Sequence, residues 1–371
     1  MLRLTLPQLT LAAALISSSA SAQSISALAS FGGGDGWLAP SEGGITYLTT
    51  GDTQRGMAYG NGHLYLVNRN LGNSIVRLDG TTGADLGSPL SLSGVTGGTF
   101  VINKIAVASD GKVYVGNLAT AMSAGAPYKV YAWANDAATP TTAFSGNTLT
   151  GARMGDSTLG VSGTGSSTRL YSGFAASPAI AGNNGYAVID PTAATSTTVG
   201  FVGTPPAAGD FRLGLTVGPS GQVWGNQGSL TLRETSFSGA SGTLLGTASG
   251  LTSIAERPMS FATINGLPVV ATISTGDSTV RIYDASNPLS LALMLTKNNT
   301  SGALTSNGNG TGDVAWGDSF SNGDGTSTAT LYTLSSNQGI QAFTVIIPEP
   351  ATFSLAVLGL GAFGLRRKLK K

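Results

Sequence analysis

Basic residues recur at one place in a repeated pattern of strands, and no other set of side chains in this sequence is better suited to bind a ligand. In five of six repeats, a lysine or arginine stands at or just before the first expected strand; these residues are Arg55, Lys104, Arg153, Arg212 and Arg257. The sixth repeat has Asp313. If these strands surround one axis, the cations form a ring. A cleft lined by one sign of charge attracts the opposite charge, so we expect an anionic polysaccharide, such as one carrying uronates.

An asparagine ends the second strand in at least three repeats, at the same face as the basic residue. These asparagines are Asn68, Asn117 and Asn226. Their amide groups would add hydrogen-bonding groups to a ligand site at that face. The alternative for both sets is that strand ends lie in solvent, where polar and charged side chains are common.

Residues that could catalyse a reaction or hold a metal are few. His63 is the only histidine and the chain has no cysteine, which excludes multi-His sites, disulfides and thiolate chemistry. Asp318, Asn322 and Asp324 resemble part of a calcium loop, but the twelfth position is Ala329 and the third lacks an acidic residue. We therefore expect a hairpin turn there, no catalytic residues and no cofactor. Calcium is the alternative.

The middle of the chain consists of repeats. Residues 55–68, RGMAYGNGHLYLVN, align without a gap with residues 104–117, KIAVASDGKVYVGN. Each reads as two strands joined by Asn-Gly or Asp-Gly, the pairs preferred in type I′ turns because both central residues need positive φ. Weaker copies follow, and the six begin near residues 55, 104, 153, 212, 257 and 312. That spacing, with three or four strands per copy, is typical of β-propeller blades.

We therefore predict an all-β domain over residues 43–345, a six-bladed β-propeller. A seven-bladed propeller and a β-sandwich are the alternatives. A strand expected at residues 45–50, ITYLTT, would complete the last blade and close the ring without an exposed sheet edge. Residues 23–42 are rich in Gly and Ser and are expected to form a linker.

Residues 1–22 are typical of a secretory signal peptide. Arg3 supplies the positive end, an apolar run follows, and Ala20 and Ala22 form a cleavage site for signal peptidase. Between this segment and the last 26 residues, 13 basic and 17 acidic residues remain, so the domain is mildly acidic. Nucleic-acid binding is therefore not expected, because it requires concentrated Lys and Arg.

The last 26 residues, 346–371, have a Pro-Glu-Pro signature, an apolar run and a basic end, in that order. The signature is Pro348, Glu349 and Pro350, and the basic end begins with Arg366 and Arg367. Proline disfavours helix in the preceding residue, so the signature should be extended and accessible. The 15 apolar residues predict a hydrophobic transmembrane helix. Such a helix spans roughly 22 Å, and snorkelling Lys and Arg would help it to cross the bilayer.

This tail resembles the PEP-CTERM sorting signal of Gram-negative bacteria. The resemblance implies that the tail holds the precursor in the inner membrane until exosortase, a membrane protease-transpeptidase, recognises the Pro-Glu-Pro motif and cuts near it. It also implies a passenger that reaches the cell surface or the outside, commonly in bacteria that make exopolysaccharide. An ordinary single-span anchor is the alternative. Both interpretations place the rest of the chain outside the cytoplasm.

Two functions fit these observations. The first is a non-catalytic propeller that binds a glycan or another component of the cell surface or extracellular matrix. The second is a secreted calcium-dependent hydrolase or lyase of the six-bladed type. The second requires several acidic side chains around one ion. The predicted channel positions are mainly basic and amide, which favours the first.

Overall fold

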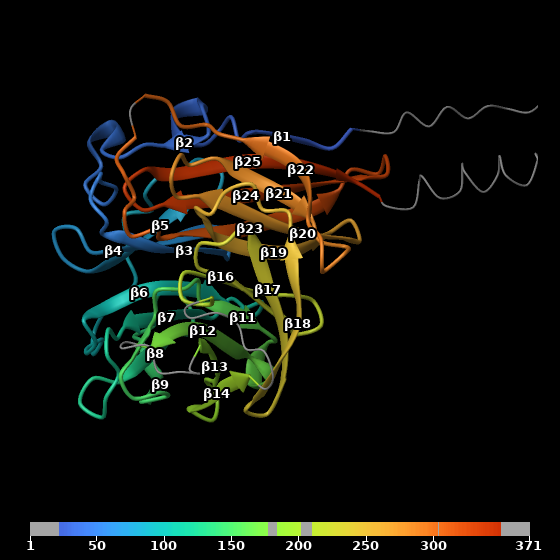
Figure 1. Cartoon of the computed structure of the whole chain (residues 1–371). Coiled ribbons are helices and arrows are strands. Elements are labelled where there is room, and N and C mark those ends of the chain that lie inside the picture. The colour runs from blue at the N-terminus through green and yellow to red at the C-terminus, as the bar shows by residue number, and fades with distance from the viewer. Residues whose placement is uncertain (1–21, 177–183, 202–209, 303, 350–371) are drawn as a thin grey trace, which may run out of the picture.

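The computed structural model describes residues 22–176, 184–201, 210–302 and 304–349 (Figure 1). The expected signal peptide, apart from residue 22, and the expected C-terminal helix lie outside these residues. Within them, no helix is long and apolar enough to span a membrane. The described helices are three short 3-10 turns, η1 (Gly32–Gly34), η2 (Glu42–Gly44) and η3 (Gly165–Ser167).

Strands dominate the described residues, and four of the sheets have three to five strands each. One contains β3 (Gln54–Gly60), β4 (His63–Asn68) and β5 (Ser74–Asp79). The next contains β6 (Phe100–Val107), β7 (Val113–Leu118), β8 (Tyr128–Trp133) and β9 (Thr141–Gly146). A third contains β19 (Glu256–Ile264), β20 (Leu267–Ser274), β21 (Val280–Asp284) and β22 (Ala292–Lys297). The fourth contains β23 (Gly312–Ser321), β24 (Thr326–Ser335), β25 (Gly339–Pro348), β1 (Ser24–Ala27) and β2 (Trp37–Leu38).

The remaining strands form one nine-stranded sheet. Its first part contains β10 (Ala152–Met154), β11 (Gly160–Ser162), β12 (Arg169–Ala176), β13 (Asn184–Asp190) and β14 (Thr195–Phe201). Its second part contains β15 (Gly214–Val217), β16 (Val223–Asn226), β17 (Thr231–Ser238) and β18 (Ser241–Ser249). Among the residues that the structure describes, the parts are paired only where β14 and β18 run parallel, through Gly200 with Ser241 and Phe201 with Gly242.

The sheets surround an axis, which confirms the prediction of an all-β, propeller-like domain. Strands at the inner side contact one another in a closed cycle that runs β3, β6, β11, β15, β19, β23 and back to β3. Figure 1 shows the sheet of β23–β25 on one side of the molecule and the sheet of β6–β9 on the opposite side. Four blade-like sheets and the nine-stranded sheet together complete the circuit.

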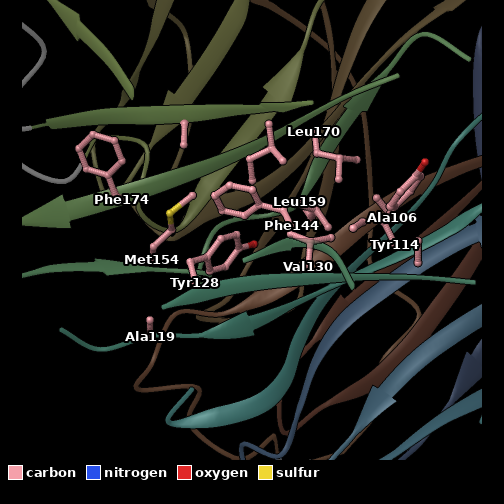
Figure 2. Packing of buried hydrophobic residues seen from close by; sticks show 14 of the residues in the cluster. Ala106, Tyr114, Ala119, Tyr128, Val130, Phe144, Met154, Leu159, Leu170 and Phe174 are labelled. Atoms are coloured by element: carbon pink, nitrogen blue, oxygen red, sulfur yellow. The ribbon is translucent and has the colours of Figure 1, made fainter. Parts of the chain in front are cut away.

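The hydrophobic core lies between neighbouring sheets. One cluster joins β6–β9 to β10–β13, and Figure 2 shows Tyr128 and Phe144 facing Leu170 and Phe174 across this boundary. These four side chains are at most 4 % exposed. Burial of a large apolar side chain contributes roughly 1.5–3 kcal/mol, so packing between sheets is the main cohesive force.

The N-terminal part differs from two expectations. Residues 45–50 do not form the outer strand of the last sheet; Leu48 is buried in the core, but the backbone there is not in a ladder. Instead β1 pairs with β25, with Ser24 opposite Ile346 and Ala27 opposite Phe343. The segment expected as a linker is therefore part of the sheet. Residues 45–50 and β1 both contain apolar residues suited to an edge strand. Packing against β25 determines that β1 takes this position.

The two hairpin turns expected from the repeat also differ from each other. Asn61 and Gly62 both have positive φ, 55° and 75°, as a type I′ turn requires. At the second turn only Gly111 has positive φ, and the N–H of Ala108 donates to the carbonyl of Lys112. The Asp110 carboxylate instead accepts from the N–H of Gly165, in the next sheet. The aspartate therefore stabilises a longer turn.

Gly173 in β12 offers a test of the packing between the two parts of the nine-stranded sheet. A Cβ at this position would overlap the backbone carbonyl of Phe211. We expect Gly173→Ala to lower the free energy of unfolding by about 1–3 kcal/mol, the usual cost of overpacking, in a urea titration. Gly125→Ala is the control, because no atom lies within 4 Å of the added methyl group. Equal stability of the two variants would contradict this packing.

Candidate functional site

A cavity of about 250 Å³ lies on the axis where the inner strands meet. Six segments line it: Met57–Tyr59, Ile105–Val107, Thr158–Val161, Leu215–Val217, Met259–Phe261 and Asp313–Trp316. Each segment contributes one small residue away from its ends, which leaves space between the strands; these residues are Ala58, Ala106, Gly160, Thr216, Ser260 and Ala315. The cavity is therefore a product of the closed strand cycle.

A buried ion pair lies at one end of the cavity. Lys104 Nζ is 3.6 Å from Asp313 Oδ2, and the two side chains are each 1 % exposed. Lys104 also donates to the carbonyl of Gly312 at 2.5 Å, and Asp313 accepts from the N–H of Met57 at 3.2 Å. Burial lowers the pKa of Lys104 and raises the pKa of Asp313, while each partner's charge opposes the shift. Lys104, expected in a solvated ring, is thus sealed inside the domain.

Three of the predicted basic residues converge on one buried carboxylate, Asp156. Arg55 Nη1 lies 3.7 Å from its Oδ1, and Arg212 Nη2 lies 3.5 Å from its Oδ2. Arg153 Nε contacts the same Oδ2. Asp156 is 1 % exposed and lies between β10 and β11. The three arginines come from different repeats, and the closed fold brings them together around this carboxylate.

Two further arginines complete this group. Arg69 donates to the carbonyl of Asp52 at 3.1 Å, and its guanidinium lies 3.7 Å from the centre of the Phe100 ring. Burial, and then the nearby Arg55, lower the pKa of Arg69 to about 10. Burial likewise lowers the pKa of Arg257, with a second contribution from the charge of Arg212. In both residues burial is the larger cause of the lowered pKa, and the neighbouring guanidinium is the smaller one.

We call this group the basic mouth. It comprises Arg55, Arg69, Arg153, Arg212 and Arg257, with the carboxylates of Asp52 and Asp156. Asp52 pairs with Arg55 at 3.0 Å. Arg257 is the fifth cation, and its side chain makes no hydrogen bond or ion pair with any residue that the structure describes; its Nε is buried without a partner. Five guanidinium groups therefore face two carboxylates, and the mouth carries surplus positive charge.

Three members of the basic mouth, Asp52, Arg69 and Asp156, were not anticipated from the sequence. Asp156 begins a weak repeat and follows Arg153 by three residues, but only the fold brings it to Arg55 and Arg212. Arg69 follows directly after Asn68, at the end of β4. A basic residue beside a strand end is the sequence signal that Arg69 shares with the predicted residues, but Arg69 follows a second strand and not a first one.

The three predicted asparagines are used inside the protein. They are at most 5 % exposed. The Asn68 amide donates to Ser74 Oγ, and the Asn117 amide donates to the carbonyl of Pro127. The Asn226 amide donates to the carbonyl of Glu256 at 2.9 Å. The Asn68 and Asn117 amides therefore stabilise the connection after a second strand, and the Asn226 amide bonds both to that connection, at the carbonyl of Ser229, and to β19.

The weak calcium candidates do not converge. Asp318 accepts from the Tyr59 hydroxyl at 2.6 Å. Asn322 and Asp324 instead hydrogen-bond to Thr326, within the β23–β24 hairpin. In the described part of the chain, no group of three or more His, Cys, Asp and Glu is placed to hold a metal ion.

His63 lies away from the basic mouth, in a separate polar group on the outside of β4. Its Nε2 is 3.5 Å from Asp136 Oδ2, and Arg77 contacts the same oxygen at 2.6 Å. The Tyr65 hydroxyl donates to the other carboxylate oxygen at 2.7 Å. Asp136 therefore joins β4 and β5 to the end of β8, a structural role.

The buried pair of Lys104 and Asp313 allows a test by a double-mutant cycle. Lys104→Met leaves the Asp313 carboxylate buried without its cation, and we expect a loss of about 3–5 kcal/mol in the free energy of unfolding. Adding Asp313→Asn removes that charge and keeps an acceptor for the Met57 N–H, so most of the loss should return. Chemical denaturation of the three variants measures this coupling. Additive losses would show that the two residues do not interact.

Comparison with known families identifies two segments. Residues 40–217 match a domain of unknown function, DUF4623, and residues 347–369 match the PEP-CTERM protein-sorting motif. The chain therefore carries a PEP-CTERM sorting motif, as expected from its Pro-Glu-Pro signature and basic end. This motif indicates export and a surface or extracellular location.

Comparison with solved structures gave matches of low sequence identity. A DUF4623 family protein from Bacteroides eggerthii is 14% identical with a TM-score of 0.58, over 82% of this chain and 73% of that one. The major Malassezia sympodialis allergen Mala s 1 is 12% identical with a TM-score of 0.49, over 81% and 95%. A PQQ-bound aldose sugar dehydrogenase from Streptomyces coelicolor is 16% identical with a TM-score of 0.48, over 88% and 99%. A comparison with curated proteins gave no match.

Proposed function

We propose that this exported DUF4623-containing protein is a six-bladed propeller that binds an anionic polysaccharide at its basic mouth without catalysing a reaction. The tail holds the precursor in the inner membrane, and exosortase releases the domain to the cell surface or extracellular matrix. The observation that carries the binding proposal is Arg257, a guanidinium without a described partner beside Arg212 and a carboxylate already shared by three arginines.

The six-bladed count follows from treating the nine-stranded sheet as two blades. Its two parts pair through only two residues of each strand, and the direction of that pairing is parallel. Neighbouring strands within a propeller blade are antiparallel, so this short contact is a join between blades. Each of the six strands in the inner cycle then lies at the inner edge of one blade.

Crowding of guanidinium groups favours an anionic ligand. Like charges at short range repel, and partial burial makes this repulsion larger than in water. A ligand carboxylate placed between Arg212 and Arg257 would relieve it and accept charge-assisted hydrogen bonds, which arginine forms with planar, two-pronged geometry. A uronate unit of a polysaccharide presents such a carboxylate.

Calorimetric titration of the mature protein with a polyuronate tests this binding. We expect binding that weakens as salt rises, because exposed charges are screened, and no binding to a neutral glucan. Arg257→Met should reduce the affinity about tenfold or more, since a hydrogen bond to a charged group contributes roughly 1.5–3 kcal/mol. Arg169→Met is the control: Arg169 forms a more exposed ion pair with Asp190 at 3.1 Å, outside the basic mouth.

Equal affinity of the two variants would contradict a site at the basic mouth. Measurement of calcium in the same purified protein separates the alternative function. One tightly bound calcium ion per chain would favour the calcium-dependent hydrolase or lyase.

Replacement of Pro348, Glu349 and Pro350 by alanines tests the processing route. In cells that contain an exosortase, we expect the wild-type precursor to lose its tail and the triple variant to remain at precursor size, because the recognition motif is gone. Immunoblots of membrane and culture-medium fractions measure this. Cells without an exosortase supply the control, and equal processing of both proteins would contradict the route.

A further inference from the structure

The sorting motif begins inside the folded domain. Pro348, its first residue, is the last residue of β25 and is paired with Thr326 of β24. On its other side, β25 is paired with β1, where Ser24 lies opposite Ile346 (Figure 1). Ile347 is 0 % exposed and packs in the core between this sheet and β19–β22. The Pro-Glu-Pro signature was expected to be accessible, but the residues just before it are paired or buried in the sheet.

Backbone hydrogen bonds continue one residue further along the motif. The N–H of Glu349 donates to the carbonyl of Gly325 at 2.8 Å. Asn265, in the hairpin turn of the neighbouring sheet, donates its amide to the carbonyl of Ile347 at 3.2 Å and to that of Gly325 at 3.3 Å. We call these four residues the end clamp: Asn265, Gly325, Ile347 and Glu349. The clamp is made by two sheets, so it exists only in the folded domain.

We propose that the end clamp sets the processing site: the cut falls at the Glu349–Pro350 bond or C-terminal to it, and not before Glu349. This inference rests on the proposed processing by exosortase. A protease that binds its substrate as an extended chain needs the scissile bond to lie outside the existing ladder, because a backbone group paired there cannot also pair with the protease. Before Glu349, that backbone already pairs with β24, with β1 or with Asn265. Reaching it would require the last strand to leave the core.

The chemical outcome preserves the fold. Hydrolysis breaks one peptide bond and adds one water, which leaves a new carboxylate on the domain and a new amine on the tail. A cut at or after Glu349 keeps all of β25, including Ile347. Because β1 starts two residues after the expected signal-peptidase site, the two processed ends of the mature domain lie on neighbouring strands at one corner.

Digestion of the full precursor in detergent by proteinase K tests the clamp without exosortase. Mass spectrometry should show that trimming of the wild-type tail stops at residue 349 or later. Asn265→Gly removes the clamping amide but tolerates the positive φ of 52° at this turn. We expect this variant to be trimmed past Ile347 at least several-fold faster than the wild type.

Asn61→Gly is the matched control, because Asn61 also precedes a glycine in a hairpin turn and has a φ of 55°. It should behave as the wild type does. Trimming of the native wild-type protein to a residue before Glu349 would overturn the proposal, and so would identical trimming of the Asn265→Gly and wild-type proteins.

The mature protein from exosortase-containing cells gives a second readout. An intact mass that ends at Glu349 or later supports the proposal, and one that ends earlier overturns it. An uncut precursor in those cells would contradict exosortase processing, and the digestion in detergent would then decide on the clamp by itself.

Discussion

Closure of the inner strands into one cycle is the constraint on which the rest of this structure depends. Each sheet buries apolar side chains against the next, as Tyr128 and Phe144 do against Leu170 and Phe174. A sheet without a neighbour would expose such a face to water, and burial is the dominant favourable term in folding. The hydrophobic core is therefore divided among the boundaries between sheets, and the burial at each boundary depends on closure of the ring.

Closure of the ring also brings together charged residues that lie far apart in the sequence. Arginines from separate repeats meet at Asp156, and Lys104 is enclosed with Asp313. A buried charge is tolerated only with a partner, so the axis is organised by ion pairs at one end of the cavity. In the basic mouth, guanidinium groups outnumber carboxylates. The resulting positive charge would attract a polyanion.

The last strand of the domain, β25, also contains the first residue of the sorting motif. β25 lies between β24 and β1 and runs directly into Pro348 and Glu349. The same strand therefore completes the last sheet and leads into the sorting motif. Folding brings Ser24–Ala27 next to the end of β25, although the chain separates the two segments by more than 300 residues.

The sequence by itself determined the local features of the fold and the sorting motif. The Asn61-Gly62 turn follows from glycine and asparagine tolerating positive φ, and the repeat spacing indicates strands around an axis. The sorting motif is read directly from its residues. Each of these signals lies within a short stretch of chain, so no distant contact is needed to interpret it.

Tertiary structure alone decided which strand fills the edge of the last sheet, which lysine is buried and which carboxylate collects the arginines. Residues 24–27 and 45–50 are both plausible edge strands, and only packing against β25 separates them. Lys104 and Arg55 occupy aligned repeat positions, yet only Lys104 is enclosed with Asp313, more than 200 residues away. Pairing energy depends on distance and burial, and both are set by the closed ring rather than by neighbours in sequence.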